Sequence, residues 1–281
     1  MNAVATEALP SLGVGLGYRA PFLSDLFRLR ERVDFLEITA DHFFDVPPEA
    51  LDELDLLADH FPLIPHGLDL SLGSAEGADP AYLDKFADLV NRLDPPWWSE
   101  HLAFTRAGGI SIGHLATLPY TREAVDVVAR NVEAVRRRID VPLILENVTA
   151  TVLVPGSEMD EPEFLTAVLD GTGCGWLCDV TNMYTNAVNR GIEPASWLDR
   201  WPWDRIVQMH FAGGHWHDGI LIDSHAHPAS PEVWAALEEA VARSPVKGII
   251  LERDERLPPL GELLDEVDRA RAIGRRHGRW A

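Results

Sequence analysis

Histidines and carboxylates end seven of the eight strand-like segments in this sequence. These residues are Glu37, His66, Glu100 with His101, Glu146, Asp179, His210 and Glu252. A strand that is buried on both faces seldom carries such a group unless the group has a polar partner. Mixed imidazole and carboxylate ligands suit iron, manganese or zinc, and the lack of a paired C-x-x-C motif argues against a structural zinc site. The sequence therefore predicts a metal centre built from strand ends.

The segment after the seventh strand-like run adds further candidate ligands. Within HFAGGHWHDGILIDSHAHP these are His215, His217, Asp223, His225 and His227. So many ligands exceed what one ion can use, which predicts two or three ions that share a bridging carboxylate, with Glu146 as the central candidate. Asp223 and His225 stand two apart in the strand-like ILIDSH and are expected to point to one face. The roles of the other three histidines stay open between outer hydrogen-bond donors and a solvated stretch.

Several of these residues also have a simpler interpretation. Glu37 is interpreted either as a ligand or as a partner that orients a histidine. Asn182 shares the turn CDVTNMY with Asp179 and is either a ligand or the cap of the next helix. Cys178 is interpreted as a core residue. Histidines in predicted loops or helices are interpreted as ordinary hydrogen-bonded residues: His42, His60, His114 and His277.

Strand-like segments alternate with helical patterns, and this alternation predicts the fold. The eight apolar runs are residues 12–19, 33–39, 62–68, 97–104, 142–149, 174–181, 205–213 and 246–254. Such alternation indicates right-handed βαβ units and a parallel sheet. An open doubly wound sheet would gather its site at one switch point, whereas polar residues here end nearly every strand. We therefore predict an α/β fold, with a single (β/α)8 TIM barrel as the catalytic domain over residues 11–281 and a flexible N-terminus at residues 1–10.

Helix ends are also visible in the sequence. Thr121 precedes a helical pattern at residues 122–138, which has arginines in its last turn as the helix dipole favours. Asp160 is the predicted cap of a helix at residues 161–170, and Gly171 is expected to follow its end.

Composition and charge limit the classes of partner. The formal charge of −21 and the pI near 4.8 argue against nucleic acid or an anionic membrane. No apolar run is long enough to cross a bilayer, and the N-terminus MNAVATEALPSLG lacks the pattern of a secretory signal. Cys174 and Cys178 stand four apart in one predicted strand, too far to form a disulfide. We therefore expect a cytoplasmic protein.

A series of longer motifs resembles a known family. In order they are GVGLGYR, VDFLEIT, PHGLDLSLGS, SEHLAF, LPYTREA, LILENVT, GCGWLCDVTNMY, HFAGG, LIDSHAHP and ILERD, over about residues 11–265. Together they resemble the DUF692 family, the multinuclear non-haem iron-dependent oxidases that include the methanobactin and 3-thiaglutamate biosynthesis enzymes. The expected barrel is of the xylose-isomerase-like type.

The resemblance implies a ligand set, position by position. The implied metal ligands are His66, His101, Glu146, Asp179, Asn182, His210, Asp223, His225 and Glu252. Glu146 is expected to bridge two irons, and with Asp179 and His210 it is assigned to the catalytic centre. Six of the nine positions also follow from the strand ends alone.

The resemblance also implies an activity, the O2-dependent oxidation of a ribosomally synthesised precursor peptide, often at cysteine. The implied cofactor is two or three irons in a mixed Fe(II)/Fe(III) state, with O2 as co-substrate. Family members usually act with a small partner that recognises the leader peptide. We expect a separate leader-binding partner here, because the chain has no spare segment for that task.

Several positions depart from the usual motifs of the family. LEITADHF at residues 36–43 replaces LEVHAENF, Thr181 replaces an asparagine, Arg253 replaces an aromatic residue, and His227 is an additional histidine. These departures leave the implied ligand set intact and alter the expected lining of the pocket. We therefore expect these departures to affect which substrate is bound and to leave metal binding unaffected.

Two alternative functions stay open. A divalent-metal-dependent sugar isomerase or epimerase of the xylose-isomerase-like type also gathers Glu, Asp and His around two ions. Such enzymes commonly place a lysine in the site, and Lys85 and Lys247 are expected away from the barrel mouth. A metal-dependent peptide-binding or scaffold protein without turnover is the second alternative. A related endonuclease is disfavoured because it needs a basic face to bind DNA.

Overall fold

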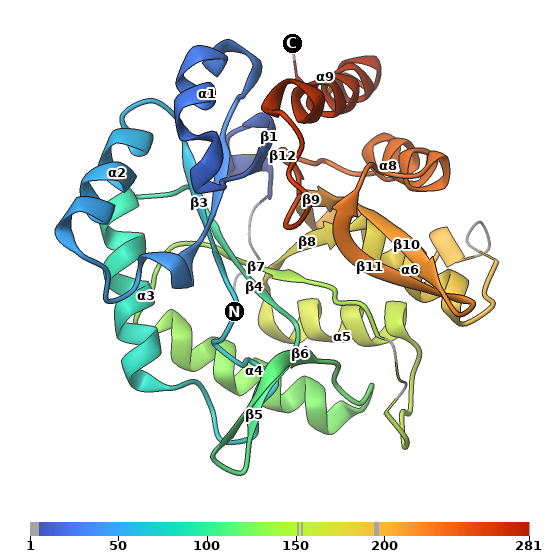
Figure 1. Cartoon of the computed structure of the whole chain (residues 1–281). Helices are drawn as coiled ribbons and strands as arrows, with labels where there is room; N and C mark the ends of the chain where they lie inside the picture. The colour runs from blue at the N-terminus through green and yellow to red at the C-terminus, as the bar shows by residue number, and fades with distance from the viewer. Residues whose placement is uncertain (1–5, 151, 153, 194–196, 281) are drawn as a thin grey trace.

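Eight parallel strands form a closed barrel, as the sequence predicts (Figure 1). The computed structural model describes residues 6–150, 152, 154–193 and 197–280. The barrel strands are β1 (Gly13–Gly17), β2 (Leu36–Thr39), β3 (Leu63–Gly67), β4 (Trp98–His101), β7 (Leu143–Glu146), β8 (Gly175–Asp179), β9 (Ile206–Phe211) and β12 (Gly248–Leu251). They pair in the order β1-β12-β9-β8-β7-β4-β3-β2. Each strand lies within a run that was predicted as a strand, so the (β/α)8 barrel is confirmed.

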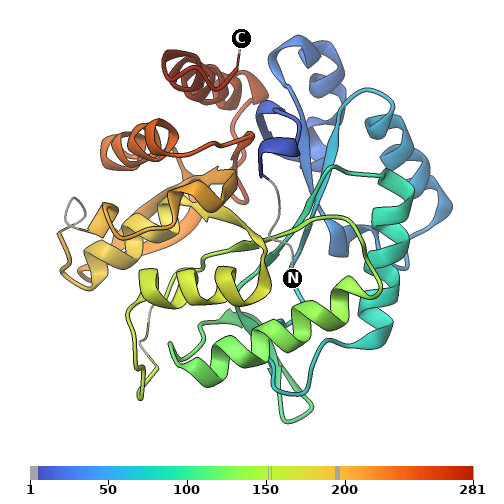
Figure 2. The same ribbon diagram turned by 180° about the vertical axis from the view of Figure 1, so that it is seen from behind.

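Helices connect the strands and form an outer layer around the barrel (Figures 1 and 2). The α-helices are α1 (Leu23–Arg28), α2 (Pro48–Ala58), α3 (Pro80–Leu93), α4 (Arg122–Arg136), α5 (Glu161–Thr172), α6 (Val180–Asn189), α8 (Pro231–Arg243) and α9 (Leu260–Arg276). Short 3-10 helices are η1 (Thr6–Ala8), η2 (Ala20–Phe22), η3 (Arg30–Arg32), η4 (Ala40–Phe43) and η5 (Trp203–Arg205).

Two predicted helix starts are confirmed, and one predicted helix end is wrong. The Thr121 hydroxyl caps α4, and Asp160 caps α5 in a reciprocal capping box. Helix α5 does not stop before Gly171 but continues to Thr172, and its C-cap is Gly173 with a φ of 68°. Glycine suits that left-handed conformation because it has no Cβ to clash.

Inside the barrel, an apolar layer supports a polar layer. The apolar layer is a separate buried cluster of Phe35, Ile64, Trp97, Ile144, Leu177, Val207 and Ile250. Two residues further along five of these segments stand Glu37, His66, Glu146, Asp179 and Glu252. Residues two apart on a strand share one face, so the polar side chains lie directly above the apolar ones. The polar layer therefore faces the carboxyl end of the barrel, and the apolar layer closes the space below it.

Two β-hairpins extend from the barrel (Figure 1). The first, after β4, pairs β5 (Phe104–Ala107) with β6 (Ile110–Ala116), and the second, after β9, pairs β10 (Gly213–His217) with β11 (Ile220–His227). Both are antiparallel sheets of two strands, separate from the barrel sheet. The strand-like ILIDSH is confirmed as part of β11, whereas β5, β6 and β10 were not predicted.

The N-terminal segment lies partly outside the described residues. Of the predicted flexible segment at residues 1–10, residues 1–5 are not described, and η1 begins at Thr6. Leu9 packs against the apolar layer. In the part of the chain that the structure describes, no helix combines the length and apolar character needed to cross a membrane.

The two cysteines are buried and are not joined to each other. Cys174 and Cys178 are both free thiols with no exposed surface. Burial raises the pKa of both thiols, and the charges of Asp179 and Glu146 raise that of Cys178 further. The prediction that they form no disulfide is confirmed, as is the place of Cys178 in the core.

Gly15 is a position where β1 cannot accept a side chain. A Cβ there would lie 2.0 Å from the carbonyl oxygen of Phe35, and both backbones belong to the barrel wall. We expect Gly15→Ala to lower the free energy of unfolding by about 1–3 kcal/mol or more, measured by urea unfolding. Gly261→Ala in α9 is the matched control, because nothing lies within 4 Å of its Cβ position. The control should be neutral or more stable by up to about 1 kcal/mol, and equal stability of the two variants would contradict the prediction.

Candidate metal centre

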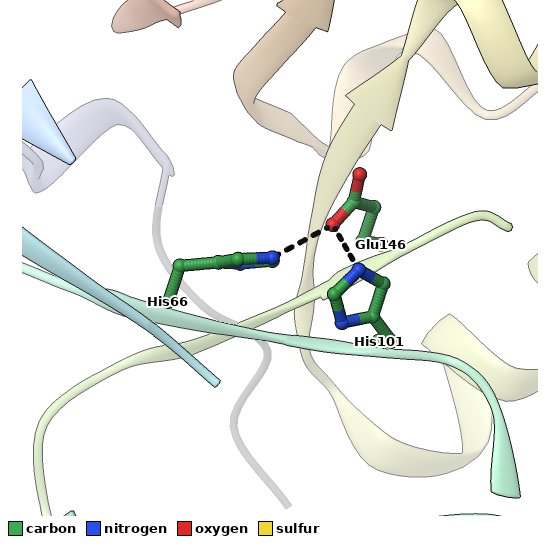
Figure 3. A group of neighbouring side chains, drawn as sticks. All are labelled: His66, His101 and Glu146. Carbon is green, nitrogen blue, oxygen red and sulfur yellow. Dashed lines mark ion pairs between the residues drawn. The ribbon is translucent and has the colours of Figure 1, made fainter. Parts of the chain in front are cut away.

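Two histidines on neighbouring strands face the same carboxylate oxygen (Figure 3). Nε2 of His66 at the end of β3 lies 3.4 Å from Oε2 of Glu146, and Nε2 of His101 at the end of β4 lies 3.3 Å from the same atom. All three side chains are buried. Among the described residues, no hydrogen-bond donor reaches this Oε2. A buried carboxylate oxygen without a donor is costly, and a cation placed between the three groups would remove that cost.

The other oxygen of Glu146 faces a second group of candidate ligands. Its Oε1 lies 3.2 Å from Nδ1 of His210, and the same nitrogen lies 3.2 Å from Oε2 of Glu252. One ligand atom from each of Glu146, Asp179, His210 and Glu252 lies within 4.8 Å of the others. Oδ2 of Asp179 is a second buried oxygen without a donor in the described structure. Glu146 thus turns one oxygen to each group, as a carboxylate that bridges two ions does.

A third set of candidate ligands meets the second group at Glu252. Nε2 of His225 on β11 lies 3.0 Å from Oδ1 of Asp223, and its Nδ1 lies 3.4 Å from Oε2 of Glu252. The hydroxyl of Thr149 donates to Oδ1 of Asn182 and lies 3.4 Å from Oδ2 of Asp223. The structure therefore brings the nine implied ligands together in three adjoining groups.

The alternative role of Asn182 as a helix cap is wrong. Asp179 is the N-cap of α6, because its Oδ1 accepts a hydrogen bond of 2.7 Å from the backbone N–H of Asn182. The Asn182 side chain instead donates to the carbonyl oxygen of Asn147 at 3.0 Å. Its amide oxygen points toward Thr149, beside the Asp223 carboxylate.

Hydrogen bonds behind two of the histidines fix the orientation of their rings. Nδ1 of His66 and the hydroxyl of Ser99 are 2.8 Å apart, and Nδ1 of His101 donates to the carbonyl oxygen of Gly67 at 3.0 Å. With Nδ1 engaged in this way, each ring presents Nε2 to Glu146.

Glu37 lies behind His210, which supports its interpretation as an orienting partner. Its two oxygens are 2.9 and 3.0 Å from Nε2 of His210. Gln208 donates to Glu37 at 2.5 Å and accepts from the indole of Trp97 at 2.8 Å. Gln208 and Ser99 were not predicted, but each stands two residues before a predicted histidine on the same strand. The two-residue period of a strand is the signal that finds them.

The charged groups in this cluster shift one another's pKa values. Burial lowers the pKa of His210 and of His225, but the surrounding carboxylates, Glu252 first, raise both well above their ordinary value. Burial and neighbouring carboxylates raise the pKa of Asp179 well above its ordinary value. A buried group of carboxylates that disfavour one another's charge is stabilised by cations.

A cavity of about 610 Å³ opens onto the cluster. Its apolar wall includes Leu68 after β3, Leu115 on the first hairpin, and Leu221 on the second. Arg19 and Asp254 also line it. Both hairpins therefore contribute to the walls above the candidate ligands.

Other candidate residues lie outside the three groups. The Glu100 side chain accepts a hydrogen bond from the backbone of Leu70 at 3.1 Å and does not join the cluster. His42 and His114 line the cavity wall. The rings of His215 and His227 pack together, with 5.5 Å between their centroids. His217 is exposed at the end of β10.

Comparison with known proteins identifies the family. A family model described as the RiPP precursor modification enzyme MbnB/TglH/ChrH matches residues 13–275. The chain belongs to this family. Its members are described as enzymes that modify ribosomally synthesised precursor peptides, and the resemblance seen in the sequence is confirmed.

Curated relatives and a solved structure agree with this assignment. A UPF0276 protein of Caulobacter vibrioides is 37% identical over 97% of this chain and 95% of its own length. A UPF0276 protein of Streptomyces avermitilis is 39% identical over 93% of this chain, which spans only 55% of that relative. The solved xylose isomerase domain protein of Planctomyces limnophilus has a TM-score of 0.60 at 12% identity, over 96% of this chain and 100% of its own. That likeness confirms the xylose-isomerase-like barrel fold.

His101 gives the metal-free protein a pH-dependent stability. Burial lowers the pKa of His101, but Glu146 and Glu100 raise it more, to about 9. In the unfolded chain its ordinary value is 6.5. The stabilisation is therefore fully present below that value and is lost as the pH rises through about 9.

We expect chelator-treated protein to lose on the order of 1–3 kcal/mol of unfolding free energy between pH 6.5 and 9. His101→Gln should lose less unfolding free energy over this pH range, because the variant lacks the titrating imidazole. His60→Gln, at an exposed position on the outer surface, should follow the wild type. Urea unfolding at a series of pH values measures all three, and a flat wild-type profile would count against the interpretation.

Proposed function

We propose that this chain is a multinuclear non-haem iron-dependent oxidase that uses O2 to modify a precursor peptide, at a cysteine. The observation that carries the proposal is the position of Glu146, whose two oxygens face two separate histidine-containing groups. Membership of a precursor-modification family supports a peptide as the substrate. The proposed metal ligands are His66, His101, Glu146, Asp179, Asn182, His210, Asp223, His225 and Glu252.

The chemistry of the donor set supports iron. Imidazole nitrogens and carboxylate oxygens are accepted by iron in both oxidation states, and the candidate groups contain no thiolate. The buried, unpartnered oxygens of Glu146 and Asp179 also fit cations at this place. Three adjoining groups of ligands support two or three ions, and we propose for them the mixed Fe(II)/Fe(III) state that the resemblance implies. Bound iron would supply Lewis acidity toward a thiol and redox chemistry with O2.

Residues of the chain would bind and orient the reacting groups. Ser99 and the Gly67 carbonyl hold the rings of His66 and His101. Glu37 holds His210 from behind. The apolar layer below excludes water from that side, so a substrate would reach the centre from the cavity. In this proposal Glu146, which belongs to both of the first two groups, forms the catalytic core together with Asp179 and His210 of the second group.

We further propose that the peptide substrate is presented by a separate leader-binding partner. The cavity volume of about 610 Å³ is within the range of sites that hold small ligands. Ile110 on the first hairpin is 71% exposed, and Trp216 on the second is 60% exposed. Both residues stand on the hairpins that also line the cavity, so a peptide or partner that covered them would bury apolar surface.

A divalent-metal-dependent sugar isomerase or epimerase is the alternative. The barrel likeness to a xylose isomerase domain protein supports the fold alone at 12% identity. Among the described residues, no lysine lines the cavity. Lys85 on α3 pairs with Asp45, and Lys247 immediately precedes β12, at the amino end of the barrel strands. A site without lysine fits this alternative less well than it fits the oxidase.

Metal content is the first test of the proposal. We expect protein purified without air from iron-supplemented cells to retain two or three irons per chain, quantified by elemental analysis and Mössbauer spectroscopy. His101→Ala and Glu146→Ala should each lower the iron content by at least one ion, because each removes a ligand. His60→Ala is the control, at an exposed position on the outer surface, and should keep the full iron content.

The same samples separate the competing functions. Oxygen consumption with a cysteine-containing precursor peptide and its partner supports the oxidase. Stoichiometric manganese, magnesium or zinc without iron, together with turnover of a sugar, would replace it by the isomerase. Peptide binding to the iron-loaded protein without oxygen consumption would favour a scaffold protein.

A further inference from the structure

The hairpin that carries Asp223 and His225 is not held by the barrel sheet. In the described structure β10 and β11 pair only with each other. One anchor is Asn189 at the end of α6, which exchanges two hydrogen bonds of 2.9 Å with the backbone of Leu221. That anchor lies four residues before His225, so the imidazole needs a closer support to keep its place.

Asp254 supplies this support through two contacts with His225. Its backbone N–H donates to the carbonyl oxygen of His225 at 3.0 Å. Its Oδ2 lies 3.0 Å from Nδ1 of the imidazole. A carboxylate oxygen accepts, so Nδ1 carries a proton that it donates to Asp254, while Nε2 faces the Asp223 carboxylate.

The backbone of His225 also needs a restraint. Its φ is 50°, in the left-handed region that is unfavourable for a residue with a side chain. The surrounding structure must offset the cost of this conformation. The hydrogen bond from the Asp254 backbone acts at the carbonyl of this strained residue.

Arg19 connects Asp254 to the barrel. Its Nη2 forms an ion pair with Oδ1 of Asp254, and its Nη1 donates to the carbonyl oxygen of Tyr18 at 2.7 Å. Arg19 follows β1 and Asp254 follows β12, and these two strands pair with each other. The Arg19–Asp254 pair thus connects the ends of two paired barrel strands to His225 on the hairpin.

We propose that Asp254, held by Arg19, is a positioning residue for His225, and that it makes the metal position at Asp223 and His225 separable from the two positions on the barrel strands. This inference rests on the proposed metal centre. His66, His101 and His210 keep their own orienting partners, which all lie on the barrel strands. Loss of Asp254 therefore affects one metal position and leaves the other two.

Metal titration tests the separation. With ferrous iron added under argon, we expect Asp254→Ala to bind its last ion 10- to 100-fold more weakly than the wild type, or to lose it. Arg19→Met should have a smaller effect in the same direction, and Asp254→Glu should restore part of the affinity. Asp55→Ala is the matched control, because Asp55 is equally paired with an arginine, Arg92, on the outer helices. Unchanged affinity in Asp254→Ala, or the loss of every ion from a folded variant, would overturn the proposal.

Nitrogen NMR of histidine-labelled, metal-free protein tests the positioning without metal. We expect a protonated, exchange-protected Nδ1 on His225 in the wild type. In Asp254→Ala this proton should exchange rapidly, while the signals of His210 stay in place. An unprotonated Nδ1 in the wild type, or an unaltered signal in the variant, would refute the positioning role. If the wild type retains no metal, the proposed oxidase fails, yet this measurement still decides whether Asp254 orients His225.

Discussion

The buried carboxylate of Glu146 is the group around which the candidate histidine ligands are arranged. Both of its oxygens are buried, one toward His66 and His101 and the other toward His210. Removing such a charge from water costs several kcal/mol unless neighbouring groups offset it. The arrangement depends on the place of β7 in the barrel, with β4 and β3 on one side and β8 and β9 on the other, so that histidines of β3, β4 and β9 reach one side chain. Ser99, Gly67 and Glu37 in turn hold the three histidines that face this carboxylate.

The barrel meets this requirement through the alternation of its strands. The same period that turns Ile64 and Ile144 into the floor turns His66 and Glu146 into the layer above. The candidate ligands of this layer therefore stand on the strands of the wall itself. The hairpins are built differently, because in the described structure their strands form a backbone ladder only with each other and contact the rest of the chain through single hydrogen bonds.

Much of this organisation could be predicted from the sequence, and the failures have physical causes. Strand ends were predictable because a polar residue that ends a buried apolar run needs a polar partner, and such partners meet at the barrel mouth. Glu100 ends its strand as His101 does, but adjacent residues point to opposite faces, and only the histidine faces inward. The contact between Arg19 and Asp254 joins residues 235 apart, and no local pattern reports such a pair. The first hairpin was not predicted because its strands are mostly exposed and form no buried apolar run.

The burial of the two cysteines protects their sulfur atoms from oxidation. An enzyme that generates oxidants beside a substrate thiol is exposed to damage of its own sulfur atoms. Cys174 and Cys178 have no exposed surface, and their raised pKa values leave them as unreactive thiols. They are the only cysteines in the sequence. For the proposed oxidase, neither cysteine is an accessible sulfhydryl that would compete with the peptide, so its working lifetime would not depend on a reductant that repairs cysteine.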